Sequence, residues 1–142
     1  KPKFLGDCDI VFSVGYLKKI NSEIIENYEI INLHPSLLPK YKGLMTHKRM
    51  LINNEVNYGY SIHRVARYLD DGEILSRNQK NISTSSENEL SLSHKELEHQ
   101  CVFKDLISFL NTTANKYLAD QHYLDLFGRN GTSAINSIFR VF

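Results

Sequence analysis

The sequence predicts an α/β domain with a mostly parallel sheet. Residues 9–14 (DIVFSV) form a short apolar run rich in β-branched residues, which is typical of a strand covered on both faces. A second such run occupies residues 29–33 (EIINL), and apolar residues at helical spacing lie between the two runs. Strand, helix and strand in this order form a βαβ unit, whose two strands run parallel.

The first helix is predicted between these two strands. Leu17, Ile20, Ile24 and Ile25 fall at i, i+3, i+7 and i+8, so they share one helix face. Asn21 is a candidate N-cap in this segment, because its side-chain oxygen can accept a hydrogen bond from the first turn of a helix.

A segment with two prolines separates the second strand from the next elements. Residues 34–43 (HPSLLPKYKG) are predicted to form a loop, because proline lacks the backbone donor that a helix or central strand needs. Thr46 begins a short helix that continues to about Asn53. Residues 57–65 alternate as a strand does, and after an acidic loop a further strand is predicted over residues 73–76.

The longest helix is predicted after a Ser/Asn-rich loop. Ser86 and Glu89 have the spacing of a capping box at its start. The apolar stripe of this helix consists of Phe103, Leu106, Ile107 and Leu110. The pattern weakens beyond Thr113. Helical spacing returns at Ile135, Ile138, Phe139 and Phe142, so residues 113–142 are predicted to form a helical extension.

Composition and charge exclude several classes of protein. The chain has 142 residues with 17 Lys+Arg against 16 Asp+Glu, so it lacks the basic excess of a dedicated nucleic-acid-binding domain. Its apolar runs are far shorter than the roughly 20 residues that cross a bilayer. Cys8 and Cys101 show no metal or redox spacing and suit the reduced cytoplasm. We therefore expect a cytoplasmic protein that binds neither nucleic acid nor a membrane.

The sequence does not predict a metal site. His94 and His99 lie on one predicted helix, but they are five residues apart rather than the four that would align two ligands on one face. The acidic loop with Asp70, Asp71 and Glu73 lacks further oxygen ligands for a hard cation.

Asn32 and His34 are the first candidate site residues. They lie at the carboxyl end of the second predicted strand, where open α/β sheets bind ligands, and at i and i+2 they point to the same side. An amide and an imidazole side by side can hold an oxyanion, and a nearby carboxylate would keep the imidazole protonated. Asp70 and Asp71 are both candidates for that carboxylate, whereas His63 is expected to be a structural residue of its strand.

Two longer motifs surround these residues. The segment from Asn32 to Gly43 (NLHPSLLPKYKG), followed by residues 69–75 (LDDGEIL), resembles the signature of the formyltransferases that use 10-formyltetrahydrofolate. His34 and Asp70 are 36 positions apart, which is the separation of the catalytic His and Asp in that family. The resemblance extends from about Cys8 to Leu110 and implies a Rossmann-like formyltransferase fold.

The resemblance also implies roles for individual residues. Asn32 and His34 would stabilise the oxyanion that forms when an amine attacks the formyl carbon, and Asp70 would orient a water molecule and help to move the proton of the amine. The implied substrates are 10-formyltetrahydrofolate and a small-molecule amine. The resemblance implies no metal, and it leaves open whether the protein forms a homodimer. The implied folate-binding residues are Tyr16, Leu17, Lys18, Ile20, Val65, Ala66 and Arg67.

The resemblance implies fewer residues for binding the amine substrate. Pro35 and Glu98 are expected to contact the amine, although an alignment shifted by one residue would select His99 instead. The segments 44–47 (LMTH) and 98–99 (EH) are most similar to the branch that formylates glycinamide ribonucleotide in purine biosynthesis. Formylation of a nucleotide-linked amino sugar is the alternative, and a non-catalytic folate-binding fragment is a third reading.

The resemblance further implies that the chain is part of a longer domain. Residues 1–112 would be the C-terminal portion of the catalytic domain, and the N-terminal strands of the family, which carry a glycine-rich phosphate-binding turn, are expected to be missing. Residues 113–142 then form an extension of unknown role.

Overall fold

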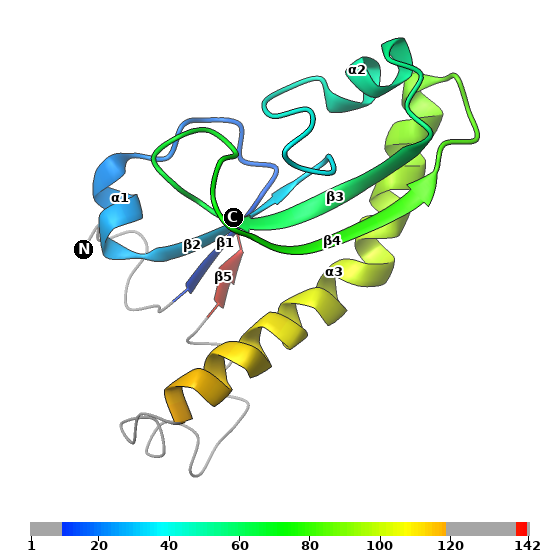
Figure 1. Cartoon of the computed structure of the whole chain (residues 1–142). Helices are drawn as coiled ribbons and strands as arrows, with labels where there is room; N and C mark the ends of the chain where they lie inside the picture. The colour runs from blue at the N-terminus through cyan, green and yellow to red at the C-terminus, as the bar shows by residue number, and fades with distance from the viewer. Residues whose placement is uncertain (1–9, 119–138, 142) are drawn as a thin grey trace.

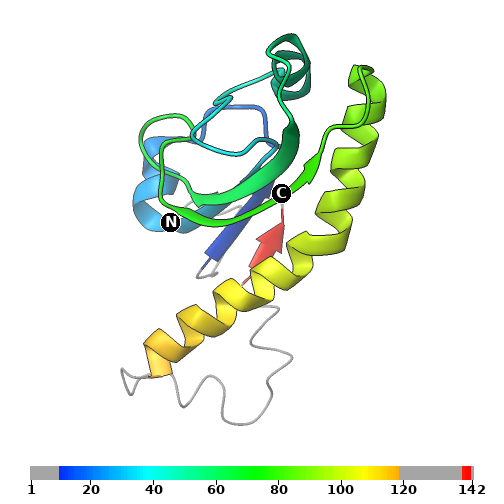
Figure 2. The same ribbon diagram turned by 45° about the vertical axis from the view of Figure 1, so that its right-hand side comes forward.

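The computed structural model describes residues 10–118 and 139–141, which form three layers, with one sheet between helices (Figures 1 and 2). The strands are β1 (Ile10–Val14), β2 (Glu29–His34), β3 (Asn57–Arg64), β4 (Ile74–Asn81) and β5 (Phe139–Val141). The helices are α1 (Ser22–Asn27), α2 (Thr46–Ile52) and α3 (Glu87–Leu118). Among the described helices, α3 included, none is long and apolar enough to span a membrane.

The sheet has the strand order β4-β3-β2-β1-β5 and is mixed. The expected parallel arrangement holds for β1 with β2 and for β1 with β5. In contrast, β3 pairs antiparallel with both β2 and β4. The difference arises because the connection from β2 through the short α2 to β3, and the loop from β3 to β4, do not carry the chain back across the sheet, so each next strand runs in the opposite direction. The α/β class is confirmed.

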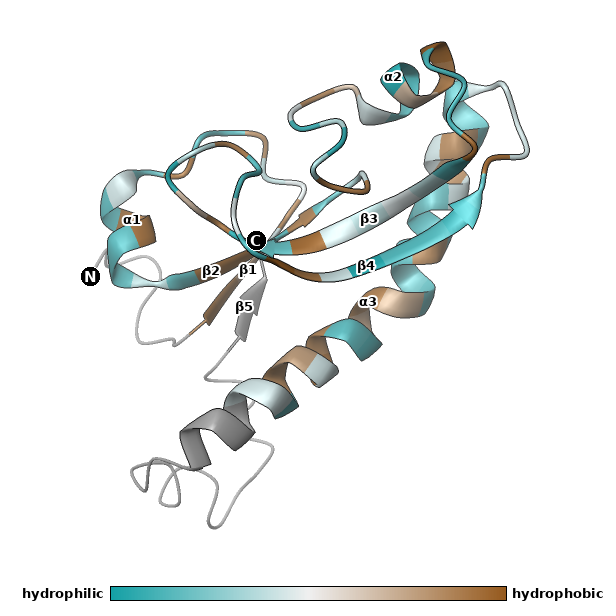
Figure 3. Cartoon of the chain, in the orientation of Figure 1, coloured by the Kyte–Doolittle hydropathy of each residue, from teal (hydrophilic) through white to brown (hydrophobic). Residues whose placement is uncertain are grey.

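The two faces of the sheet have separate hydrophobic cores. Ile10 and Phe12 of β1 belong to the larger core, which includes Leu90 and Leu97 of α3. Val11, which lies between them, belongs to a smaller core with Ile24 and Ile25 of α1 packed against it. This alternation explains why β1 and β2 carry apolar residues on both faces, whereas the edge strand β4 is mostly hydrophilic (Figure 3).

The first helix begins later than the spacing of its apolar residues predicts. Asn21 is the N-cap, as expected, and its side chain accepts a hydrogen bond of 2.9 Å from the backbone N–H of Glu23. The helix therefore starts at Ser22. Leu17 and Ile20 precede it in the connection from β1, where they line the cavity described below instead of a helix face.

The face of the long helix that packs against the sheet overlaps the predicted stripe only in part, since Leu106 and Leu110 belong to both. Ser86 accepts a hydrogen bond from the backbone N–H of Glu89, as a capping box requires, whereas the Glu89 carboxylate bonds the Thr84 hydroxyl. Of the predicted stripe, Phe103 and Ile107 are exposed. The face that packs against the sheet carries Leu97, Cys101, Val102, Leu106, Phe109 and Leu110.

The prediction of a helical extension is only partly correct. Residues 113–118 continue α3 without a break. Residues 139–141, predicted as helical from their spacing, instead form β5 and pair with β1 in parallel. The unpaired backbone groups at the edge of a sheet can bind a further strand in this way. Helical spacing over so few residues is too weak a signal to exclude a strand. Ile135, Ile138 and Phe142 lie outside the described residues.

Candidate active site

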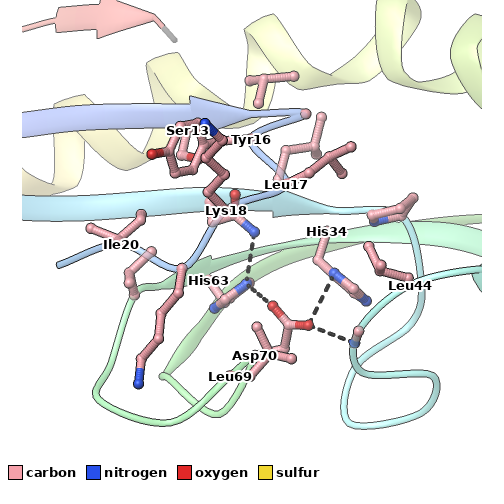
Figure 4. A pocket seen from close by; sticks show the side chains of 18 of the residues that line it. Ser13, Tyr16, Leu17, Lys18, Ile20, His34, Leu44, His63, Leu69 and Asp70 are labelled. Atoms are coloured by element: carbon pink, nitrogen blue, oxygen red, sulfur yellow. Dashed lines mark hydrogen bonds and ion pairs between the residues drawn. The ribbon is translucent and has the colours of Figure 1, made fainter.

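A cavity of about 830 Å³ lies at the carboxyl ends of β1 and β2. Its wall includes the end of β1 and the connection after it, the end of β2, and the turn before α2 with the start of that helix. The end of β3 with the loop after it, one residue of α1 and one residue of α3 complete the wall. Every residue that the sequence predicts for the site lines this cavity, from both the catalytic and the folate-binding sets. Figure 4 shows His34, His63 and Asp70 together on one side of it.

Asn32 is oriented by its neighbour across the sheet. The antiparallel register places it opposite His63 of β3, and its Nδ2 lies 3.3 Å from Nε2 of that ring. Nδ1 of His63 is 2.9 Å from the backbone carbonyl of Arg64, which can only accept, so Nδ1 carries the ring hydrogen. Burial lowers the pKa of His63, which keeps the ring neutral. Nε2 therefore accepts a hydrogen bond from the Asn32 amide.

His34 has partners at both ring nitrogens. Nε2 donates a hydrogen bond of 2.9 Å to the backbone carbonyl of Tyr41, and Nδ1 lies 3.4 Å from Oδ2 of Asp70. Both side chains are almost fully buried, with 6% of His34 and 8% of Asp70 exposed. The His34 ring therefore lies between the Tyr41 carbonyl at Nε2 and the Asp70 carboxylate at Nδ1.

Asp70 lies between the two histidines. Its Oδ1 is 3.6 Å from Nε2 of His63, and its Oδ2 accepts a hydrogen bond of 2.8 Å from the backbone N–H of Gly43 (Figure 4). Its φ of 50° is left-handed, which is uncommon for a residue other than glycine and recurs at functional sites. The neighbouring Asp71 is 53% exposed and pairs with Lys42 instead. Of the two candidate carboxylates, Asp70 is therefore the one beside His34.

Gly72 allows the loop with Asp70 to return to the sheet. A Cβ atom at position 72 would lie only 1.8 Å from the carbonyl oxygen of Arg64. The chain then enters β4, and the Arg64 N–H donates a hydrogen bond of 2.8 Å to the carbonyl of Glu73. This close approach fixes the ends of the loop that positions Asp70.

The predicted folate-binding residues form two stretches of the cavity wall. Residues 16–20 follow β1, and residues 65–67 follow β3. The side chains at 16–19 are mostly exposed, and Leu17 is 79% exposed. Apolar side chains that are open to a cavity offer a surface for a flat aromatic ligand.

Glu98 is the α3 residue that lines the cavity, whereas the adjacent His99 is exposed and lies outside the lining. Burial raises the pKa of the Glu98 carboxyl. Of the two residues that the sequence left open, Glu98 is therefore the one that lines the cavity. Pro35, the other residue expected to contact the amine, lines the cavity directly after His34.

Comparison with known proteins identifies the family. Residues 6–106 match the family model described as formyl transferase. The chain belongs to this family. It is 38% identical over 69 residues to the phosphoribosylglycinamide formyltransferase of Escherichia coli (strain K12), covering 47% of this chain and 32% of that protein.

Two further relatives show the range of the formyl transferase similarity. The chain is 41% identical over 71 residues to the bifunctional polymyxin resistance protein ArnA of Wigglesworthia glossinidia brevipalpis, covering 49% of this chain and 11% of that protein. The structure of phosphoribosylglycinamide formyltransferase from Brucella melitensis superposes with a TM-score of 0.65 at 32% identity, covering 71% of this chain and 53% of that one. The chain thus spans a third or less of the two curated relatives and about half of the solved structure.

The formyl transferase cavity includes residues that the sequence did not select. His63 was expected to be structural, yet it contacts both Asn32 and Asp70. Its position opposite Asn32 depends on the register of two strands that are distant in the sequence, which hydropathy does not reveal. His47 also lines the cavity. Within the described residues, no three His, Cys, Asp or Glu side chains gather as a metal site would require.

Proposed function

We propose that the protein containing this chain transfers the formyl group of 10-formyltetrahydrofolate to a primary amine, and that Asn32, His34 and Asp70 act at the reacting atoms. The observation that carries the proposal is the meeting of these three side chains at one cavity, where the backbone N–H of Gly43 holds the Asp70 carboxylate beside His34. Membership of the formyl transferase family supports this reaction class.

In the proposed mechanism the amine nitrogen attacks the formyl carbon, and the carbonyl electron pair moves to the oxygen. Asn32 donates to this oxyanion through the amide hydrogen that His63 does not use, and His34 donates through a ring nitrogen. Asp70 orders a water molecule that takes the proton from the amine nitrogen. The bond from the formyl carbon to N10 of the folate then breaks, and N10 receives the proton.

This mechanism requires a local change at His34. Its Nε2 hydrogen is bonded to the Tyr41 carbonyl, at the end of the proline-containing loop. The bond to Tyr41 must be exchanged for the bond to the oxyanion when the formyl group enters the cavity. Nδ1 keeps its contact with Asp70 during this exchange, so the ring is held from the other side.

The substrates are assigned to different parts of the cavity. Residues 16–20 and 65–67 would hold the folate, mainly through backbone groups, and Pro35 and Glu98 would contact the amine. Glycinamide ribonucleotide is the amine we favour, which the similarity to phosphoribosylglycinamide formyltransferases supports. A nucleotide-linked amino sugar, the alternative that the resemblance to the formyl transferase family implies, is the second candidate.

The test uses the natural protein that contains this chain. Tetrahydrofolate release from 10-formyltetrahydrofolate is measured with glycinamide ribonucleotide and, separately, with a nucleotide-linked amino sugar. We expect kcat/KM for glycinamide ribonucleotide to be at least tenfold higher, which corresponds to about 1.4 kcal/mol of transition-state binding. The reverse ratio selects the sugar, and folate binding without transfer to either amine contradicts the proposed reaction.

A further inference from the structure

A second group of titratable side chains, from α2 and α3, lies partly in the cavity wall and partly buried behind it. His47 of α2 and Glu98 of α3 line the cavity, and His94 of α3 lies between them with 1% of its surface exposed. Nε2 of His47 is 2.7 Å from Nδ1 of His94. Nε2 of His94 is 3.5 Å from Oε1 of Glu98, one helical turn further along α3.

The positions of the hydrogens follow from these contacts. Burial, together with the neighbouring His47, lowers the pKa of His94 to about 3, so the ring carries a single hydrogen. With that hydrogen on Nδ1, the lone pair of Nε2 would face the Glu98 carboxylate. With it on Nε2, the ring donates to Glu98 and accepts from His47, so that every polar atom of the ring has a complementary partner.

The long distance from Nε2 of His94 to Glu98 indicates the role of this ring nitrogen. Within the described residues, the buried Nε2 makes no hydrogen bond that meets ordinary geometry. A buried donor without a partner is unfavourable, and hydrogen bonds in ligand-free sites are often long and shorten on binding. A small movement of the half-buried Glu98 side chain toward the His94 ring would complete the bond.

We propose that His94 is a positioning residue, which holds the Glu98 carboxylate at the cavity wall in the orientation that binds the amine substrate. This inference rests on the proposed function, because it assigns Glu98 to the amine. His94 itself does not line the cavity, so it acts only through Glu98. His47 in turn fixes the His94 ring by donating to Nδ1.

The test compares two substitutions of His94 in the whole protein. In His94→Asn the side-chain amide reaches only the position of Nδ1, so the contact with His47 is kept and the one with Glu98 is lost. In His94→Gln the amide reaches the position of Nε2. His99→Asn is the matched control, since His99 is exposed on the same helix beside Glu98.

Steady-state kinetics separate positioning from general damage. We expect His94→Asn to raise KM for the amine about tenfold, because a hydrogen bond to a charged group is lost. KM for 10-formyltetrahydrofolate should change less than twofold, His94→Gln should recover most of the amine affinity, and His99→Asn should match the wild type. Equal increases in both KM values, or no recovery in His94→Gln, would overturn the inference.

A second measurement needs no turnover and no variant. The ¹⁵N spectrum of histidine-labelled wild-type protein shows which ring nitrogen of His94 carries the hydrogen. We expect Nε2–H, and an Nδ1–H tautomer would overturn the inference even in an active enzyme. If the protein formylates no amine at all, the proposed function fails, while the tautomer still decides whether His94 donates to Glu98.

Discussion

At the scale of single residues, the proposed site depends most on the side chain of Asp70, whose backbone is in the left-handed region. It contacts His34, His63 and the backbone N–H of Gly43, whereas Asp71 next to it faces solvent and pairs with Lys42. Asp70→Asn should lower kcat by about 10²- to 10⁴-fold, the usual contribution of general acid–base catalysis. Asp71→Asn is the control, and comparable kcat losses in the two variants would contradict the role of Asp70.

His94 also predicts how stability depends on pH. Its pKa is about 3 in the folded protein and about 6.5 in an unfolded chain, so protons bind the unfolded state preferentially as the pH falls below 6.5. Between pH 7 and pH 5, His94 alone should reduce the free energy of unfolding by about 2 kcal/mol. Urea denaturation at both pH values should therefore show a loss about 2 kcal/mol smaller in His94→Gln than in the wild type. An equal loss would exclude a buried neutral His94.

The catalytic residues could be predicted from the sequence to the extent that they are local. Asn32 and His34 are two positions apart on one strand, so their common direction follows from strand geometry. Reasoning from the residues alone left Asp70 and Asp71 open, and the family resemblance selected Asp70. The structure supplies the physical reason, because a left-handed backbone angle and a bond from Gly43 place the Asp70 carboxylate beside His34. The contact of His63 with Asn32 could not be predicted, because it depends on the register of two strands that are distant in the sequence.

At the scale of elements, the loop from β3 to β4 depends on glycine at position 72. Gly72→Ala would push a Cβ atom into the Arg64 carbonyl, so we expect a loss of about 3 kcal/mol in the free energy of unfolding, together with loss of activity. Gly15→Ala is the comparison, since Gly15 has a φ of 65° but nothing within 4 Å of its Cβ position. It should lose only about 1 kcal/mol. Chemical denaturation that ranks the two variants in the opposite order would contradict this reading of the loop.

The errors of element prediction share one cause, which is that hydropathy does not show where an element meets its neighbours. Leu17 and Ile20 have helical spacing with Ile24, yet the helix begins after the Asn21 cap and leaves them at the cavity. Phe103 and Ile107 have the spacing of a buried stripe but are exposed, because α3 turns the adjacent face toward the sheet.

At the scale of the whole molecule, the sheet places the cavity where the βαβ unit ends. This arrangement could be predicted, since β1, α1 and β2 are local in sequence and their crossover has a known hand. The antiparallel addition of β3 and β4 could not, because alternation of side chains is the same for either strand direction. The match to the formyl transferase family over residues 6–106 includes every residue of the cavity wall.

The most direct test of the proposed site is a crystal structure of the whole protein with a 10-formyl folate analogue that cannot transfer its formyl group. We expect the formyl oxygen within hydrogen-bond distance of Asn32 and His34, with the His34 bond to Tyr41 broken and the pterin against residues 16–20 and 65–67. An analogue bound away from Asn32, His34 and Asp70, or in the cavity with its formyl group turned away from them, would contradict formyl transfer at this site.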